Sequence, residues 1–114
     1  MRSSSDPNAS IQDIVDNAER IAAYMGAMNL AEFGADPKTR DAVERCLERI
    51  CEAAYRLGPR AAELMPGQPW SDIRGMGNRL RHGYDRIDVA VLWNAVTIEV
   101  PALKASAVAA LGSP

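Results

Sequence analysis

"PKTRDAVERCLERICEAAYRL", residues 37–57, shows the clearest structural pattern in this sequence. Its apolar residues recur at intervals of three and four, as they do on one face of a helix. They are Val43, Cys46, Leu47, Ile50, Ala53, Ala54 and Leu57. The charged residues between them fall on the opposite face, where acids and bases one turn apart form weak pairs typical of a solvated surface. Because Asp36 and Pro37 also favour the start of a helix, the stretch predicts an amphipathic helix with one buried face.

Helical patterns of the same kind occur along most of the chain. The first begins at Ser10, a plausible helix cap, and fades before Gly34 and Pro37. The others are a short turn at 60–65, helices at 71–84 and 89–99, and a short alanine-rich helix that Pro101 opens. Short connections favour antiparallel neighbours. We therefore expect an all-α protein, an antiparallel four-helix bundle with a short additional C-terminal helix, in which residues 10–114 form one domain after a disordered lead at 1–9.

Composition narrows the possible functions. The chain has 114 residues, 47% of them apolar and 25% charged, with a net charge of −2. It has room for one core but no overall basic field, so any contact with nucleic acid needs a local patch. The N-terminus lacks the apolar core of a signal peptide, and no run approaches the ~20 apolar residues of a membrane span, so we expect a cytoplasmic protein without membrane contact. With two cysteines on different sides of one predicted helix and a single histidine, we expect no disulfide, metal or cofactor.

"RGMGNRLRHGYDRID", residues 74–88, concentrates four arginines and the only histidine of the chain. If residues 71–84 are helical, Asn78 and Arg79 lie one turn before His82, and Arg74 lies one turn before Asn78. Arg81 is expected to point to another side, toward phosphate or solvent. The stretch could equally be an ordinary solvated helix with a structural histidine.

The same combination of side chains suits phosphate chemistry. Histidine titrates near neutrality, so it can take a proton from one hydroxyl and return one to a leaving oxygen. Guanidinium groups such as those of Arg74, Arg79 and Arg81 can hold a phosphodiester and offset the charge that develops on it. Because RNA supplies its own nucleophile, the 2′-hydroxyl, a ribonuclease built from these groups needs no metal. Spacing alone does not choose between this interpretation and the structural one.

Three segments of the chain resemble the HepT-like toxins, a branch of the HEPN (higher eukaryotes and prokaryotes nucleotide-binding) superfamily. They are "FGADPKTRDAVERCLERICEAAYRL" (33–57), "MPGQPW" (65–70) and "IRGMGNRLRHGYDRIDVAVLWNAV" (73–96). The resemblance covers residues 10–104 and implies a HEPN-like helical fold, a homodimer whose two sites face each other, and metal-independent cleavage of RNA. It also implies an MntA-like minimal nucleotidyltransferase as the antitoxin partner in a type VII toxin–antitoxin module.

The resemblance assigns roles within the motif Arg-x4–6-His-x-Tyr. His82 matches the catalytic histidine, and Tyr84 matches the tyrosine to which the antitoxin transfers AMP. Asn78 matches the polar residue that follows the motif arginine. The arginine itself should stand at position 77, where this sequence has Gly77.

Gly77 allows more than one interpretation. It removes the guanidinium that would bind the scissile phosphate, so activity is expected to be impaired, and Arg74 or Arg79 could replace that charge only in part because neither has the family spacing. The alternative is a degenerate, non-catalytic HEPN domain that binds the antitoxin or RNA. A structural explanation is that Gly75 and Gly77 loosen or bend the helix near a close contact, since nothing else calls for glycine inside a helix.

Overall fold

The computed structural model describes residues 6–82 and 87–112, and every regular element in these ranges is a helix. In chain order the elements are α1 (Pro7–Met25), α2 (Leu30–Gly34), α3 (Pro37–Leu57), α4 (Arg60–Leu64), α5 (Trp70–His82), α6 (Val89–Asn94), the π-helical segment η1 (Ala95–Glu99) and α7 (Val100–Gly112). The all-α class expected from the sequence is therefore confirmed.

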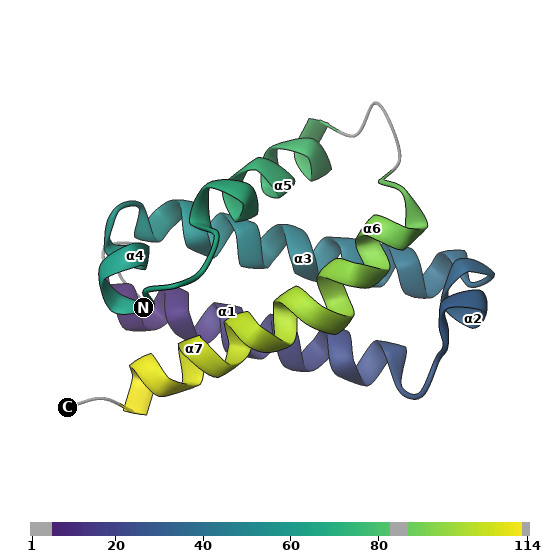
Figure 1. Ribbon diagram of the computed structural model, residues 1–114, viewed down its shortest axis with the longest axis horizontal. Coiled ribbons are helices and arrows are strands. Elements are labelled where there is room, and N and C mark those ends of the chain that lie inside the picture. The colour runs from purple at the N-terminus through teal and green to yellow at the C-terminus, as the bar shows by residue number, and fades with distance from the viewer. Residues whose placement is uncertain (1–5, 83–86, 113–114) are drawn as a thin grey trace.

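The long helices form a bundle around α3. Figure 1 shows α1 and α3 side by side, α5 lying along α3, and the continuous α6–η1–α7 helix crossing the bundle diagonally. The most extensive packing joins α1 to α3, followed by α3 to α5 and α1 to α7. α5 and α7 thus flank the central α1–α3 pair.

The core lies between α1 and α3, where both helices present their apolar faces. Every α3 residue predicted to be buried is buried, and Asp36 caps this helix by accepting hydrogen bonds from the backbone N–H and the hydroxyl of Thr39, at 3.1 and 2.9 Å. α1 contributes Ile11, Ile14 and Ile21, each with at most 1% of its surface exposed. This pairing of two amphipathic faces supplies most of the apolar burial.

The start of α1 differs from the expectation. The helix begins at Pro7, and its cap is Asp6, which accepts a hydrogen bond from the backbone N–H of Asn8 at 3.0 Å. Ser10 lies inside the helix and is buried, so its prediction as the cap is wrong. An aspartate followed by proline satisfies the cap and first-turn positions together, which explains the earlier start.

α2 was not predicted from the sequence. Its five residues are capped reciprocally: the Asn29 side chain accepts a hydrogen bond from the Glu32 backbone at 2.8 Å, and the Glu32 carboxylate accepts one from the Asn29 backbone at 2.9 Å. Phe33 in this helix is fully buried and packs against Trp93 with the ring centres 5.5 Å apart. A single short turn is therefore held by its caps and one aromatic anchor.

The last two predicted helices are present, but no loop separates them. Val89–Gly112 forms one helix of 24 residues in which η1 widens the turn just before Pro101. Proline lacks a backbone N–H and crowds the preceding turn, and a π segment relieves both problems without breaking the helix. By length and composition alone this helix (mean hydropathy 1.4, 28% buried) could cross a membrane, a test that core helices of soluble proteins also pass.

Candidate functional site

α5 carries the arginine- and histidine-containing motif and is anchored at its N-terminal end. The indole N–H of Trp70 donates a hydrogen bond to the backbone carbonyl of Met65 at 3.0 Å, and the Trp70 side chain is buried. Further along the helix, Ile73, Met76 and Leu80 are partly buried and pack against the core. Three apolar residues at helical spacing therefore fix which face of α5 points outward.

The closest approach of α5 to α3 is at Gly77. A β-carbon at this position would lie 2.5 Å from the β-carbon of Cys51 and 3.5 Å from its sulfur. Real side chains do not approach so closely, and the β-carbon of Cys51 is fixed to its backbone, so a side chain at position 77 would require the two helices to separate. Gly77 is therefore required by packing, which supports the close-contact explanation offered for this residue from the sequence.

Gly75 provides an internal comparison, because it lies two residues earlier on the same helix. A β-carbon there would meet nothing within 4 Å, and the residue is exposed. The close-contact explanation therefore applies to Gly77 and not to Gly75.

Cys51 is a buried, unoxidised cysteine on the face of α3 that α5 covers. Burial raises the pKa of its thiol to about 12, while the positive charge of Arg81 acts in the opposite direction. The thiol thus stays protonated at neutral pH, and Cys51 acts as a small packing residue rather than a nucleophile. Cys46 is also free and buried, as the sequence predicted.

Four other motif residues on α5 have side chains that the structure describes. Asn78, Arg79 and Arg81 are exposed and Arg74 is half-buried. His82 is the last residue of α5. Its side chain lies outside the described part of the chain, as does Tyr84 altogether. Because α5 is helical from Trp70 to His82, the structure confirms that Arg74, Asn78 and His82 follow one another at one-turn intervals.

Arg81 does not simply point toward solvent. Its Nη1 atom would lie 3.5 Å from a β-carbon at position 77, so its side chain folds back over one helical turn and its guanidinium lies beside Gly77. Long side chains on helices commonly run toward the N-terminus in this way. A positive charge therefore lies at the place where a side chain from position 77 would begin.

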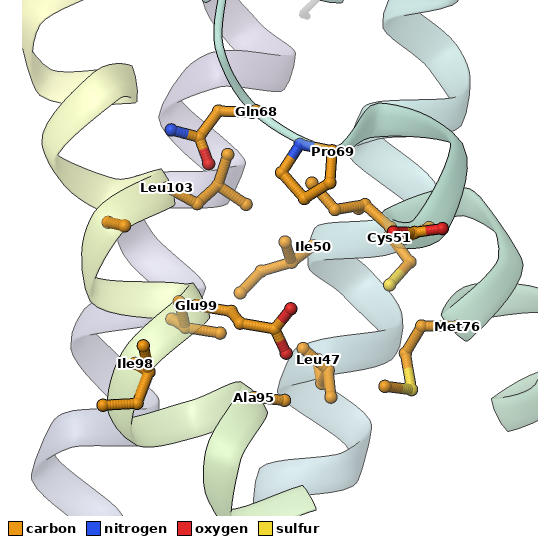
Figure 2. A pocket seen from close by; sticks show the side chains of 14 residues that line it. Leu47, Ile50, Cys51, Gln68, Pro69, Met76, Ala95, Ile98, Glu99 and Leu103 are labelled. Atoms are coloured by element: carbon orange, nitrogen blue, oxygen red, sulfur yellow. The ribbon is translucent and has the colours of Figure 1, made fainter. Parts of the chain in front are cut away.

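An apolar groove of about 280 Å³ opens between α5 and the η1–α7 helix, with Leu47, Ile50 and Cys51 of α3 at its floor (Figure 2). Met76 lines it from α5, and Ile98 lines it from the opposite helix. Its polar residues are confined to Gln68, Asp72 and Glu99, and the motif arginines do not line it. The groove is therefore unsuited to holding a phosphate.

A second groove, of about 260 Å³, lies between α1 and α3 and is lined by Asn17, three acids and three arginines. Arg56 contacts Asp13 at 2.8 Å and Glu52 at 3.7 Å, so the charges of this groove are partly paired with one another. The outer face of α3 is similar, with Arg45 and Glu48 paired at 3.0 Å. These surfaces agree with the solvated face expected from the sequence.

An all-α bundle with a histidine and several arginines on one helix is the architecture expected of a HEPN protein, and comparison with known proteins makes the family specific. The sequence matches the family described as "Ribonuclease HepT-like" over residues 14–110. It is similar to "Probable ribonuclease HepT" of Thermococcus cleftensis, with 35% identity over 82% of this chain and 86% of that protein. It is also similar to "Putative RNase MJ1380" of Methanocaldococcus jannaschii, with 33% identity over 87% and 91% of the two chains. No solved structure gives a significant match. The chain belongs to the HepT-like ribonuclease family.

Two features of the site were missed in the sequence. The contact between Cys51 and Gly77 joins residues far apart in the chain, and its only sequence signal was a glycine inside a helical pattern. The guanidinium of Arg81 lies beside that glycine, where a β-carbon would be in van der Waals contact with it and a longer side chain would compete for the same space. The helical placement of Arg74, Asn78, Arg79 and His82, by contrast, follows from the sequence pattern.

Proposed function

We propose that this protein is a metal-independent endoribonuclease that acts as the toxin of a type VII toxin–antitoxin pair in the cytoplasm. The observation that supports the proposal is that His82 belongs to the same helix, α5, as the exposed Arg79 and Arg81, in a chain of the HepT-like ribonuclease family. The helix that carries these residues is anchored by Trp70 and packed on α3, so its backbone is fixed relative to the bundle. Rigid placement of charged groups is what lowers the barrier of such a reaction.

The proposed reaction needs only groups of the protein and the RNA. The 2′-oxygen attacks the adjacent phosphorus and forms a new P–O bond, while the bond from phosphorus to the 5′-oxygen of the next nucleotide breaks. The His82 imidazole accepts the 2′-hydroxyl proton, and the imidazolium that results returns a proton to the leaving 5′-oxygen. Arginines on α5 hold the non-bridging oxygens and offset their charge.

Two further parts of the proposal concern partners. A homodimer would place two copies of the motif opposite each other, and an MntA-like nucleotidyltransferase would silence the protein by transferring AMP to Tyr84. The added phosphate would bring bulk and negative charge close to His82, which opposes RNA binding by sterics and repulsion.

Cleavage of a labelled single-stranded RNA in EDTA tests this function, with wild type and His82→Ala compared. We expect wild-type cleavage and a loss of about 10²–10⁴-fold in the variant, the usual contribution of a general acid–base group. Circular dichroism of both proteins controls for folding. Equal cleavage by wild type and His82→Ala would contradict the proposal.

The second candidate, a non-catalytic HEPN domain that binds RNA or an antitoxin, is favoured by the buried Gly77 at the family's arginine position. RNA binding without cleavage in the same experiment would support it. Gly77→Arg alone is a poor test, because the Cys51 β-carbon blocks the new side chain. Cys51→Gly/Gly77→Arg removes the obstacle, so cleavage gained only in this double variant would show that the missing arginine keeps the wild type inactive.

A further inference from the structure

The most informative charge on α5 is the guanidinium of Arg81. It lies next to Gly77, a position of the helix that has no side chain. Arg81 is exposed and takes part in no ion pair or hydrogen bond among residues 6–82 and 87–112. An arginine that lies against the protein and has no hydrogen-bond partner among the described residues can offer its donors to an anionic ligand.

The position of Arg81 has a cause elsewhere in the fold. The β-carbon of Cys51 leaves no room for a side chain at position 77, so this position must be glycine for α5 to lie against α3. The glycine in turn leaves the neighbouring surface open to the Arg81 side chain one turn later. The contact of α5 with Cys51 thus keeps position 77 without a side chain, and the guanidinium of Arg81 lies beside it.

Helical geometry separates Arg81 from the other arginines of α5. At 3.6 residues per turn, Arg74 and Arg81 are about two turns apart on one flank, with Gly77 between them. Arg79 is two residues from Arg81, which places it roughly 200° around the helix. Arg79 is therefore the rival candidate to compare with Arg81, since it has the same charge on the same helix, one turn before His82, but does not lie beside Gly77.

We propose that Arg81 is the phosphate-binding arginine of this site and supplies, from one turn later, the guanidinium that position 77 cannot carry. The inference rests on the proposed ribonuclease function for its catalytic part, because Arg81 would contact the phosphate that His82 helps to cleave. Arg81 forms no covalent bond in the reaction. Its two parallel N–H donors hold the non-bridging oxygens and stabilise the charge that grows on them.

The experiment measures both binding and cleavage of one fluorescent single-stranded RNA by the full chain. Fluorescence anisotropy gives the dissociation constant between about 50 and 200 mM salt, the range in which counterion release is clearly seen. Cleavage is followed in EDTA. The variants are Arg81→Gln, Arg81→Lys, Arg79→Gln and Arg60→Gln, the last being an exposed arginine on α4 that controls for net charge.

We expect Arg81→Gln to reduce cleavage by about 10²–10³-fold, the usual effect of removing one donor to a developing oxyanion. The slope of the logarithm of the binding constant against the logarithm of the salt concentration should become shallower by roughly 0.7, the value for one lost phosphate contact on a single strand. Arg81→Lys should recover binding but only part of the cleavage, because lysine keeps the charge and loses the paired donors. Arg79→Gln removes a charge that does not lie beside Gly77, so it should reduce both binding and cleavage less than Arg81→Gln does, and Arg60→Gln should match wild type.

The outcomes separate the two proposals. Equal losses in Arg81→Gln and Arg79→Gln would overturn the assignment of Arg81, even if the chain cleaves RNA and depends on His82. A selective loss of RNA binding in Arg81→Gln would support Arg81 even if no cleavage is seen, and would then count against the ribonuclease activity alone. A wild-type chain that neither binds nor cleaves would overturn both.

Discussion

α3 packs against its two neighbours in different ways. Toward α1 it presents bulky apolar side chains that meet Ile11, Ile14 and Ile21, all of them almost fully buried. Toward α5 it presents Cys51, whose β-carbon faces the bare backbone at Gly77. The first contact buries volume and the second brings two helices close together. We infer that the α1–α3 pair provides most of the stability, whereas the α3–α5 contact sets the position of the helix that carries the motif.

The largest effect expected from this comparison is on the free energy of unfolding after truncation in the core. Ile14→Ala should lower it by about 2–5 kcal/mol, because Ile14 is fully buried and its removal leaves a cavity. Ile73→Ala on α5, where the side chain is only partly buried, should cost clearly less. Urea unfolding followed by circular dichroism measures both, and equal losses would mean that α5 is packed as tightly as α1.

The two glycines of α5 offer a sharper comparison. Gly75→Ala should stabilise the protein by up to about 1 kcal/mol, because alanine is the better helix former and the position is open. Gly77→Ala should instead destabilise it by about 1–3 kcal/mol, since the added carbon forces α5 away from Cys51.

The same unfolding measurement on Cys51→Gly and Cys51→Gly/Gly77→Ala completes a double-mutant cycle. Removing the β-carbon at position 51 should make the alanine at 77 tolerable, so the two changes should not be additive. Stabilisation by Gly77→Ala alone, like that by Gly75→Ala, would show that the two helices are not in close contact.

Thiol labelling compares how readily local unfolding exposes Cys46 and Cys51, the two buried cysteines of α3. Cys46 and Cys51 are equally buried, and burial raises the pKa of both thiols, so each should react with a disulfide reagent only after local opening. We expect Cys51 to be labelled about tenfold faster than Cys46, a difference of ~1.4 kcal/mol in opening free energy, because α5 is the more lightly packed helix.

Cys46→Ala and Cys51→Ala each leave one thiol to follow, and alanine at 51 preserves the β-carbon that contacts Gly77. Labelling in concentrated urea should be equally fast for both. Equal rates in the native protein would mean that both thiols become exposed only on global unfolding.

The smallest expected effect concerns the cap of α3. Hydrogen bonds from Thr39 to its carboxylate lower the pKa of Asp36 below the ordinary value of 3.8. A lowered pKa in the folded state means that the cap contributes stability at neutral pH and loses it as the pH falls from 3.8 through the folded value. Asp36→Asn keeps a capping oxygen but cannot titrate, so its melting temperature should fall less steeply in this range.

Asp41→Asn is the control for this prediction, because Asp41 is an exposed acid on the same helix and makes no capping contact. Melting temperatures measured by circular dichroism from neutral pH to about pH 2 should be parallel for Asp41→Asn and wild type. If the melting temperature of Asp36→Asn falls with decreasing pH as steeply as that of wild type, the Asp36 cap does not control acid unfolding.

Local patterns were sufficient for most of the secondary structure. The apolar repeat and the Asp36 cap predicted α3, and the residues expected to be buried in it are buried. The same reasoning wrongly predicted Ser10 as the cap of α1, because Asp6 and Pro7 are a better cap and first residue for this helix. It missed α2, whose five residues are too few to show a repeat and depend on caps and on the burial of Phe33. It also did not foresee that a π turn lets one helix continue past Pro101.

The sequence by itself determined the all-α class, the buried face of α3, the grouping of His82 with arginines on one helix and the likeness to the HepT family. These follow from residue type and helical spacing, which act over a few neighbouring positions. Only the tertiary structure decided that Gly77 is required and that Arg81 lies over it. The reason is that Cys51 and Gly77 lie on different helices, and whether a β-carbon fits between two helices depends on how closely they pack.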